Sequence, residues 1–250
     1  MVFLYYGAKM TKILLSAAAI LGVLAGGVFG AVYSGGDGSA GNPYQIANAT
    51  DFQTLSATPA DWGSYFILTA NIDLTGLTFT QAPIAPDINN ANLLFDGTPF
   101  TGVFNGNDHT ISNLTIDEPA KYFIGLFGFV HYGGQILDLG VTNVDLNGKS
   151  YVGGLVGWHE DDSITSCYAS GTVAGTGDYI GGLVGVSNGS LTNCYATASV
   201  SGSNLVGGLA GLIYSGSVTS CYATGSVSGT VNDIGGLGGY NVTGSITSCY

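Results

Sequence analysis

The sequence predicts an all-β fold, a right-handed parallel β-helix with rungs of about 27 residues and a short N-terminal cap helix. A glycine phrase recurs at residues 151–157 (YVGGLVG), 179–185 (YIGGLVG), 205–211 (LVGGLAG) and 233–239 (DIGGLGG). A second phrase, beginning S-I-T-S-C-Y, places cysteines at steps of 27, 27 and 28 residues, at Cys167, Cys194, Cys221 and Cys249. Such a fixed period is typical of solenoids. The frequent Val, Ile, Thr and Tyr favour strands in each unit.

Composition limits the classes of partner. The chain has 250 residues, of which 42 are glycine and only 8% are charged, whereas an ordinary domain has about 25% charged residues. The net charge is −12, and the four basic residues are all lysines. Nucleic acids and anionic membrane surfaces require basic patches. We therefore expect no nucleic-acid or membrane-surface partner, and the acidic balance suits a secreted protein.

Residues 1–30 have the pattern of a secretory signal peptide. A positive region ends at Lys12, an apolar run follows, and small residues precede a plausible cleavage after Gly30. The alternative is a membrane anchor, for which the apolar run is short compared with the roughly 20 residues of a spanning helix. We expect a protein that is secreted or at the bacterial cell surface, with no membrane insertion after cleavage.

Residues 31–100 are predicted to form the N-terminal cap and the first rungs. Short strands are expected at 43–46, 65–69 and 71–74, and residues 78–94 are expected to be irregular. Between the first two strands, Thr50 and Gln53 fit a capping box, which predicts a helix from Asp51 to about Ala57. Further strands are expected at 100–106 and 109–116, and residues 101–250 are predicted to carry the solenoid repeats.

Stacking turns each repeat position into a column along the solenoid. Cys167 and Ala169 share parity with each other, so we predict that Cys, Ala and Val face inward. The outward column is then Tyr168, Tyr195, Tyr222 and Tyr250. The opposite phase, with Tyr inward and Cys outward, remains open. Ile164 is an odd number of residues from Cys167, so a bend or bulge must separate them if both are buried.

The glycine phrase is predicted to be structural. Its glycines imply either a positive φ or a close approach between layers where a Cβ would clash. The structural repeat positions are Gly154, Leu155, Gly157, Gly182, Leu183, Gly185, Gly208, Leu209, Gly211, Gly236, Leu237 and Gly239. Earlier copies of the two phrases are expected at residues 125–128 (GLFG), 111–114 (ISNL) and 136–139 (ILDL), with Ile111 and Ile136 aligned to Ile164.

The four cysteines allow two interpretations. An even count in an exported protein suggests disulfides. However, neighbours in one column of a parallel sheet point their Cβ atoms side by side, so we favour a ladder of buried thiols that act as small hydrophobic groups. No C-x-x-C or Cys/His cluster is present, so we expect no metal site at the cysteines.

Residues 153–157 and 181–185 (GGLVG), followed by I-T-S-C-Y-A-S-G-T-V and L-T-N-C-Y-A-T-A-S-V, resemble the GLUG motif repeat. The leading stretch resembles the usual run-in of such proteins, with GNPYQI at 41–46, LTANIDL at 68–74 and FNGNDHTISNL at 104–114. The resemblance implies a β-solenoid from a large bacterial surface or secreted protein. Adhesin-like proteins and some IgA-specific metallopeptidases carry these repeats, and the family has no shared catalytic residues to transfer.

The chain departs from the larger members in two ways. His159 and Glu160 begin like the zinc signature H-E-x-x-H, but Ser163 stands where the second histidine is required. The sequence also stops at Cys249 and Tyr250, in the middle of a repeat. We therefore expect a fragment of a longer protein with downstream modules.

The densest polar cluster, Glu160, Asp161 and Asp162 beside Trp158 and His159, has three interpretations. A polysaccharide-active enzyme would need paired carboxylates or a basic residue, and the lysines after the leader are Lys121 and Lys149. A cation site is the second interpretation, with Ca²⁺ as the candidate ion. A solvated turn insertion is the simplest, so we expect no catalytic residues, no cofactor and no enzyme.

The leading functional hypothesis is a non-catalytic extracellular module that binds a glycan or a surface protein through the solenoid face. The alternatives are a polysaccharide-active β-helix enzyme, either a lyase or a glycosidase, and a structural spacer without a ligand.

Overall fold

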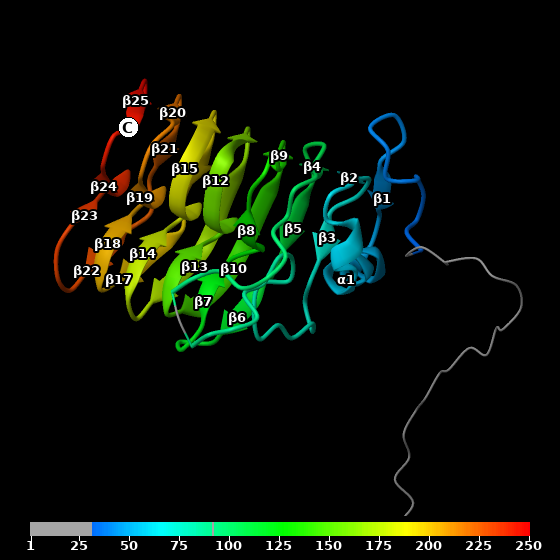
Figure 1. The fold of residues 1–250 in the computed structure, drawn as a ribbon. Helices are drawn as coiled ribbons and strands as arrows, with labels where there is room; N and C mark the ends of the chain where they lie inside the picture. Colours follow the sequence, from blue (N-terminus) through cyan, green and yellow to red (C-terminus); the bar gives the residue numbers. More distant parts are fainter. Residues whose placement is uncertain (1–31, 92) are drawn as a thin grey trace, which may run out of the picture. The chain divides into compact units, whose positions relative to one another are not determined.

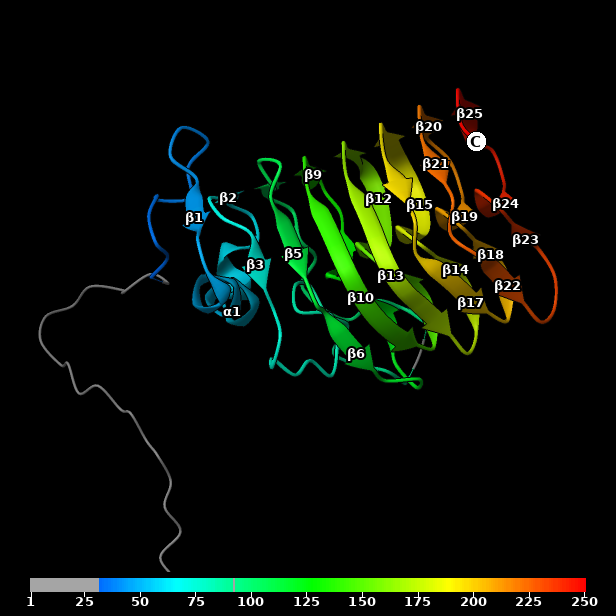
Figure 2. The same cartoon turned by 180° about the vertical axis from the view of Figure 1, so that it is seen from behind.

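The computed structural model describes residues 32–91 and 93–250, which wind into a parallel β-solenoid (Figures 1 and 2). The predicted leader lies outside the described residues. The fold class predicted from the period is confirmed, since the strands pair in parallel from rung to rung. No described helix has the length and apolar character that crossing a membrane requires.

One rung has three sides. In the central rung the first side is β11 (Ser150–Gly153), the second is β12 (Val156–Thr165) and the third is β13 (Tyr168–Gly175). The next rung repeats the order with β14 (Asp178–Gly181), β15 (Val184–Thr192), and the pair β16 (Tyr195–Ala196) and β17 (Ser199–Gly202). Each strand pairs with its counterpart one repeat later. Stacking of the rungs therefore produces three parallel sheets.

The remaining strands extend these sheets. The first side also holds β7 (Tyr122–Ile124), β18 (Asn204–Gly207) and β23 (Ile234–Gly235). The second side also holds β1 (Tyr44–Ile46), β2 (Tyr65–Leu68), β4 (Val103–Asn105), β8 (Phe127–Val130), β9 (Gln135–Leu137), β19 (Ala210–Ile213), β20 (Ser217–Thr219), β24 (Gly238–Asn241) and β25 (Ser245–Thr247). The third side, in front in Figure 2, also holds β3 (Ile72–Asp73), β5 (Thr110–Ser112), β6 (Thr115–Asp117), β10 (Gly140–Gly148), β21 (Tyr222–Ala223) and β22 (Val227–Gly229).

The cap helix α1 spans Ala49–Ala57, so the predicted helix is present and ends as predicted, but it starts two residues before Asp51 and its N-cap is Asn48 rather than Thr50. The Asn48 side chain accepts hydrogen bonds from the backbone N–H groups of Thr50 and Asp51. Asn and Asp cap helices at least as well as Thr. The prediction of Thr50 was therefore wrong by two residues. A short 3₁₀ turn, η1 (Pro59–Asp61), follows the helix.

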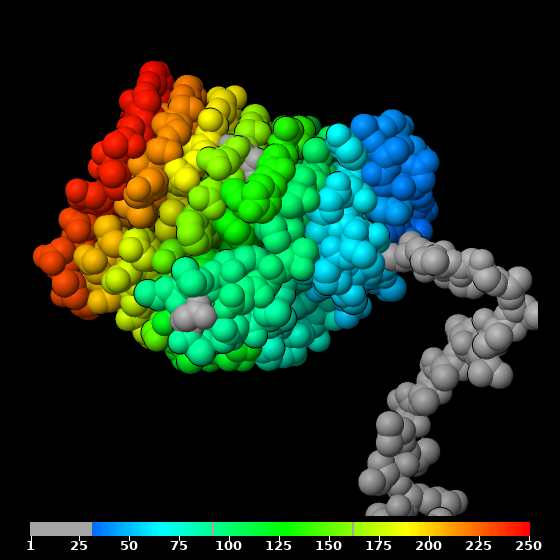
Figure 3. Space-filling view, viewed as in Figure 1, coloured from blue at the N-terminus to red at the C-terminus, as the bar shows by residue number. Residues whose placement is uncertain are grey.

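The chain between β3 and β4 leaves the regular path, as expected from its irregular composition. Isolated parallel bridges join Ile84 to Phe127 and Phe100 to Val130, so this segment lies beside β8. The ring of Phe95 packs 5.4 Å from Phe123, measured between centroids. In Figures 1 and 3 this segment, coloured teal, crosses in front of the green rungs.

The strand register shows which residues share a column with Ile164. Ile136, Leu191, Val218 and Ile246 fall in this column as predicted. Ile111 does not, because it pairs with Val141 on the third side, and Phe104 takes the place beside Ile136. The prediction for Ile111 was wrong.

The error has a physical cause, because the local pattern I-x-x-L occurs twice in this region. Both copies bend at a residue with positive φ, Asn113 in one and Asp138 in the other. The same bend therefore serves two different places in the rung, and local sequence does not separate them.

The corner between the second and third sides explains how Ile164 and Cys167 are both fully buried. Ser166 between them has φ +53°, which turns the chain and resets the side-chain alternation. The same corner has a positive φ at Asp138, Ser166, Asn193, Ser220 and Ser248. Asn and Asp tolerate this conformation better than other non-glycine residues, and the predicted bend is confirmed.

The glycines of the repeat phrase are required by close approach rather than by φ. No glycine in residues 153–157 has a positive φ, and this conformation instead falls on Tyr151 (φ +57°). A Cβ on Gly154 would lie 2.5 Å from the carbonyl oxygen of Gly182 in the next rung. A Cβ on Gly157 would lie 2.8 Å from the carbonyl oxygen of Tyr151, so the first two sides fold against each other at this corner.

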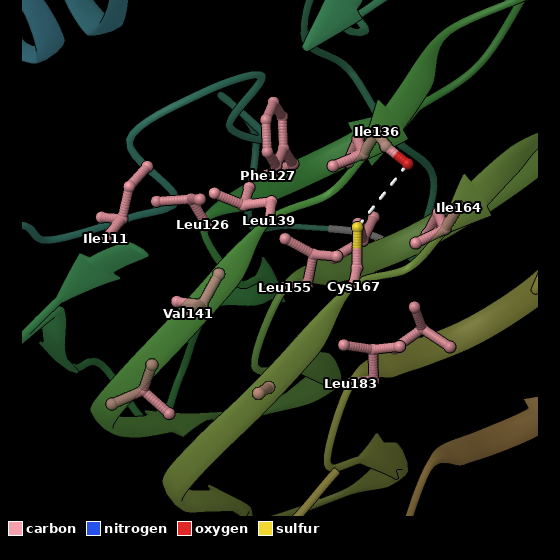
Figure 4. Close-up of a cluster of buried hydrophobic side chains, with 14 of the residues drawn as sticks. Ile111, Leu126, Phe127, Ile136, Leu139, Val141, Leu155, Ile164, Cys167 and Leu183 are labelled. Atoms are coloured by element: carbon pink, nitrogen blue, oxygen red, sulfur yellow. Dashed lines mark hydrogen bonds between the residues drawn. The ribbon is translucent and has the colours of Figure 1, made fainter. Parts of the chain in front are cut away.

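The cysteine column faces inward. Cys167, Cys194 and Cys221 are fully buried, Cys249 is half-buried, and all four are free thiols. Figure 4 shows Cys167 among Leu139, Leu155 and Ile164, with its thiol donating to the carbonyl oxygen of Ile136 at 3.6 Å. Within the column the backbone N–H of Cys194 donates to the sulfur of Cys221 at 3.4 Å. The predicted ladder of buried thiols is therefore observed.

We expect thiol reagents to detect four thiols per chain after denaturation, and Cys167 and Cys194 to react far more slowly than Cys249 in the native protein. A hydrogen bond with Cys194 lowers the pKa of Cys221 to about 7, so only its burial slows its reaction. Burial raises the pKa of Cys167 to about 12. The hydrogen bond with Cys221 and burial raise the pKa of Cys194. Because the thiolate is the nucleophile, such a shift lowers the reactive fraction near pH 8 by roughly a thousandfold. Cys249 serves as the internal control and should react first, whereas zero thiols after denaturation would contradict the ladder.

Candidate functional site

The predicted tyrosine column lies on the outer face of the third side. Tyr168, Tyr195 and Tyr222 occupy equivalent positions in β13, β16 and β21. Their ring centroids are 4.7 and 4.8 Å apart with planes inclined by 1°, and Tyr250 continues the stack at 5.1 Å. The first three rings are half-buried and Tyr250 is exposed. The phase with Cys inward and Tyr outward is thus the one observed, and we name these four residues the tyrosine ladder.

Stacking limits what the tyrosine ladder can offer. Each inner ring has its π faces covered by its neighbours, and the ring of Tyr168 lies over Gly140, where an added Cβ would be 2.4 Å from the ring. Partial burial, with the neighbouring tyrosines, raises the pKa of Tyr195, so its hydroxyl stays protonated at neutral pH. The surface therefore presents ring edges and a row of neutral hydroxyl groups, each able to donate and accept a hydrogen bond.

The polar cluster at residues 158–162 is divided by strand alternation in β12. His159 points inward, is fully buried, and lies 3.4 Å from the hydroxyl of Ser187. Glu160 faces outward and lies 3.7 Å from Nδ1 of His131. The predicted turn insertion was wrong, because β12 continues through this region. One extra residue forms a bulge at the exposed Asp161, which has φ +59°.

The two lysines considered for an enzyme each have a structural contact. Nζ of Lys121 donates to the carbonyl oxygen of Thr80 at 2.6 Å. Nζ of Lys149 lies 4.8 Å from the ring centroid of Tyr122, a cation–π distance. The structure therefore gives each lysine a partner on the scaffold, and it places Glu160 beside aromatic side chains.

A second aromatic surface, which the sequence analysis missed, lies where the first and second sides meet. Phe123, Tyr151 and Tyr179 stack one rung apart, with centroids 4.6 and 4.8 Å apart. The indole of Trp158 on the second side lies 5.6 Å from the ring of Tyr151, inclined by 11°. The signal was present in the sequence, since these three rings precede the glycine phrase at the same place in consecutive copies.

Two curated relatives match parts of this chain, and a family model described as "The GLUG motif" matches residues 148–174, 176–201 and 202–228. Halomucin of Haloquadratum walsbyi is 36% identical over 162 residues, which is 62% of this chain and 2% of halomucin. A "Putative Gly-rich membrane protein" of Evansella cellulosilytica is 32% identical over 112 residues, 44% of this chain and 12% of that protein. The chain thus spans a small part of the length of both relatives.

One solved structure resembles the fold. The crystal structure of a "putative immunoglobulin A1 protease" from Bacteroides ovatus matches with a TM-score of 0.68, at 24% identity. The match covers 87% of this chain and 77% of that chain. At this level of identity the likeness shows a shared fold.

Proposed function

This chain is a GLUG motif repeat protein with a parallel β-solenoid fold, and from that premise we propose that it is a non-catalytic extracellular module. In this proposal it is secreted or displayed on the cell surface and mediates adhesion, with a glycan or a surface protein held against the outer face of the solenoid. The naming of one relative as a Gly-rich membrane protein supports a place at the cell boundary.

The observation that carries the proposal is the tyrosine ladder. Three half-buried rings and one exposed ring stand in register on strands that are hydrogen-bonded to each other. Tyrosine offers a large contact area at low conformational-entropy cost, which is why it is enriched in binding surfaces. A rigid row of hydroxyl groups spaced by one rung fits an extended partner better than a compact one.

The acidic character of the chain is consistent with an extracellular setting. The formal net charge is −12, and a net charge far from zero keeps a protein soluble and monomeric. The overall charge therefore favours a neutral or basic partner. Neutral glycans and basic protein surfaces both have such a charge.

We expect beads coated with the full chain to adhere to cells or to immobilised glycans, and a ladder triple variant to adhere about tenfold less. This variant, Tyr168→Phe with Tyr195→Phe and Tyr222→Phe, keeps the stacked rings and removes the hydroxyl groups. Losing hydrogen bonds worth about 0.5–1.5 kcal/mol each accounts for an effect of that size.

The matched control is Tyr65→Phe, which removes one tyrosine hydroxyl outside the ladder and should leave adhesion unchanged. Circular dichroism should show the same fold for all variants. If the folded wild-type chain does not adhere, the adhesion proposal is wrong and the module is better described as a structural spacer. Equal adhesion by the ladder triple variant would remove the tyrosine ladder as the contact.

A further inference from the structure

The second aromatic surface ends abruptly along the solenoid axis. The strand register places Phe123, Tyr151, Tyr179 and Leu205 in one column, one rung apart. Leu205 has no aromatic ring, so the stack of rings stops at Tyr179. The neighbouring column on the second side loses its ring one rung earlier, since Trp158 is followed by Val186, then by Leu212 and then by Tyr240. Both columns therefore carry an aliphatic side chain in the rung of Leu205 and Leu212.

This shortening opens a hollow of about 320 Å³ on the outer face. The hollow is lined by Tyr151, Trp158, Glu160, Tyr179, Val186, Asn188, Leu212 and Tyr214, which we name the aromatic shelf. Both columns can contribute because the glycine at 157 folds the first two sides against each other, so their outward side chains converge. Tyr151, Trp158 and Tyr179 are half-buried, and Tyr214 is exposed at the rim.

Polar groups stand along one edge of the aromatic shelf. Glu160 and Asn188 occupy the same position in consecutive rungs, and Nδ2 of Asn188 donates to Oε1 of Glu160 at 3.4 Å. The hydroxyl of Ser215 donates to Oδ1 of Asn188. A carboxylate and an amide fixed beside flat rings offer both acceptors and a donor at defined positions.

A second hollow of about 490 Å³ adjoins the first and shares Trp158 and Glu160 with it. Phe95, Phe129, His131 and Tyr132 line its other walls. Trp158 and Glu160 line both hollows, which are therefore neighbours on the outer face. Two neighbouring hollows accommodate a chain of similar units better than one compact ligand.

We propose that the aromatic shelf binds a neutral oligosaccharide, with a pyranose ring stacked on the faces of Trp158 and Tyr179 and its hydroxyl groups bonded to Glu160 and Asn188. Aromatic faces carry partial negative charge, which attracts the weakly positive C–H bonds of a sugar face. A mostly apolar pocket with a few fixed polar groups is the usual form of a small-ligand site. The proposal goes beyond the proposed function, because it assigns a ligand to a surface other than the tyrosine ladder.

The geometry favours a sugar over a cation. The planes of Tyr179 and Trp158 are inclined by only 22° and 11° to that of Tyr151, so the rings are nearly parallel and do not enclose a point from several sides. An aromatic cage for an alkylammonium group instead surrounds the charge with several ring faces. Acidic sugars are disfavoured because Glu160 stands at the contact and the chain has a net charge of −12. A neutral glycan is the remaining class that fits both the shape and the charge.

The test is a titration of the full chain with cellohexaose, xylohexaose and chitohexaose. Tryptophan fluorescence and calorimetry measure the binding of each sugar. We expect at least one of the three to bind. Tyr179→Leu should raise its Kd at least tenfold, and Glu160→Gln at least threefold. Leucine is the residue that the next rung carries at this place, at a similar φ, so the Tyr179→Leu variant retains the fold.

The ladder triple variant is the matched control and should bind the hexasaccharide as wild type does. Failure of all three sugars to bind would overturn the proposal, as would a Kd unchanged by Tyr179→Leu. Binding of choline or of a trimethyl-lysine peptide that Tyr179→Leu abolishes, without sugar binding, would identify a cation site instead. Sugar binding without cell adhesion would contradict only the proposed function, and cell adhesion without sugar binding would contradict only the proposal for the aromatic shelf.

Discussion

Gly182→Ala is expected to destabilise the protein by about 3 kcal/mol or more, because the added methyl group has no space between two stacked rungs. Its Cβ would lie 2.2 Å from the carbonyl oxygen of Gly208 and 2.9 Å from Cβ of Ala196. The obstructing oxygen belongs to backbone, which cannot rotate away as a side chain does. Relief of the clash would separate the rungs and weaken the hydrogen bonds from Leu183 and Val184 to Leu209, now 2.9 and 3.1 Å long.

The same substitution at the equivalent glycine two copies further along the chain provides the matched control. Gly236 holds the equivalent place in the fourth copy of the phrase, and no atom lies within 4 Å of the position that its Cβ would take. Gly236→Ala should therefore change stability by less than about 0.5 kcal/mol. Urea unfolding followed by circular dichroism compares the two variants. Equal effects would show that the glycines are required for some reason other than stacking.

Phe104→Ala is expected to cost about 3–5 kcal/mol, the usual range for deleting a fully buried aromatic ring. Phe104 is fully buried on β4. Its ring centroid lies 6.3 Å from that of Phe66 and 5.5 Å from that of Phe127. These rings fill the core next to the cap, where the irregular segment replaces a regular rung. The cavity left by alanine cannot close without moving β4 against both of its neighbouring strands.

Two further variants make this prediction specific. Phe104→Leu keeps most of the volume and should cost less than about 1.5 kcal/mol. Tyr132→Ala removes an aromatic ring that is 75% exposed, and its effect should stay within about 0.5 kcal/mol. Thermal and urea unfolding give the free energies. A loss for Phe104→Ala no larger than that for Phe104→Leu would contradict a packed aromatic core at this level.

The sequence predicted most of the regular repeat because a solenoid relates each position mainly to its copies in the adjacent rungs. The placement of the cysteines and tyrosines on opposite faces and the bend between Ile164 and Cys167 follow from period and parity. The structure decides that the cysteines are the inward column. The errors lie where the period is interrupted. Ile111 was aligned with the wrong side because one local bend serves two places in the rung. The extra residue at Asp161 forms a bulge inside β12 instead of a turn.

The candidate site could be predicted only in part. The aromatic positions of the first side recur with the period, so the stack of Phe123, Tyr151 and Tyr179 was open to prediction. The contact between Tyr151 and Trp158 was not, because it joins two sides of one rung across a corner. The spacing of seven residues between Tyr151 and Trp158 does not predict the angle at which the two sides meet.

By itself, therefore, the sequence determined the parallel stacking, the rung length and the residues that share each column, since one period fixes which positions are neighbours along the axis. Only the tertiary structure decided how the sides of a rung meet, and with it the aromatic shelf. The reason is that the corner angle depends on the close approach of Gly157 to the backbone of Tyr151. This contact brings together residues of different columns, and the period relates only residues of the same column.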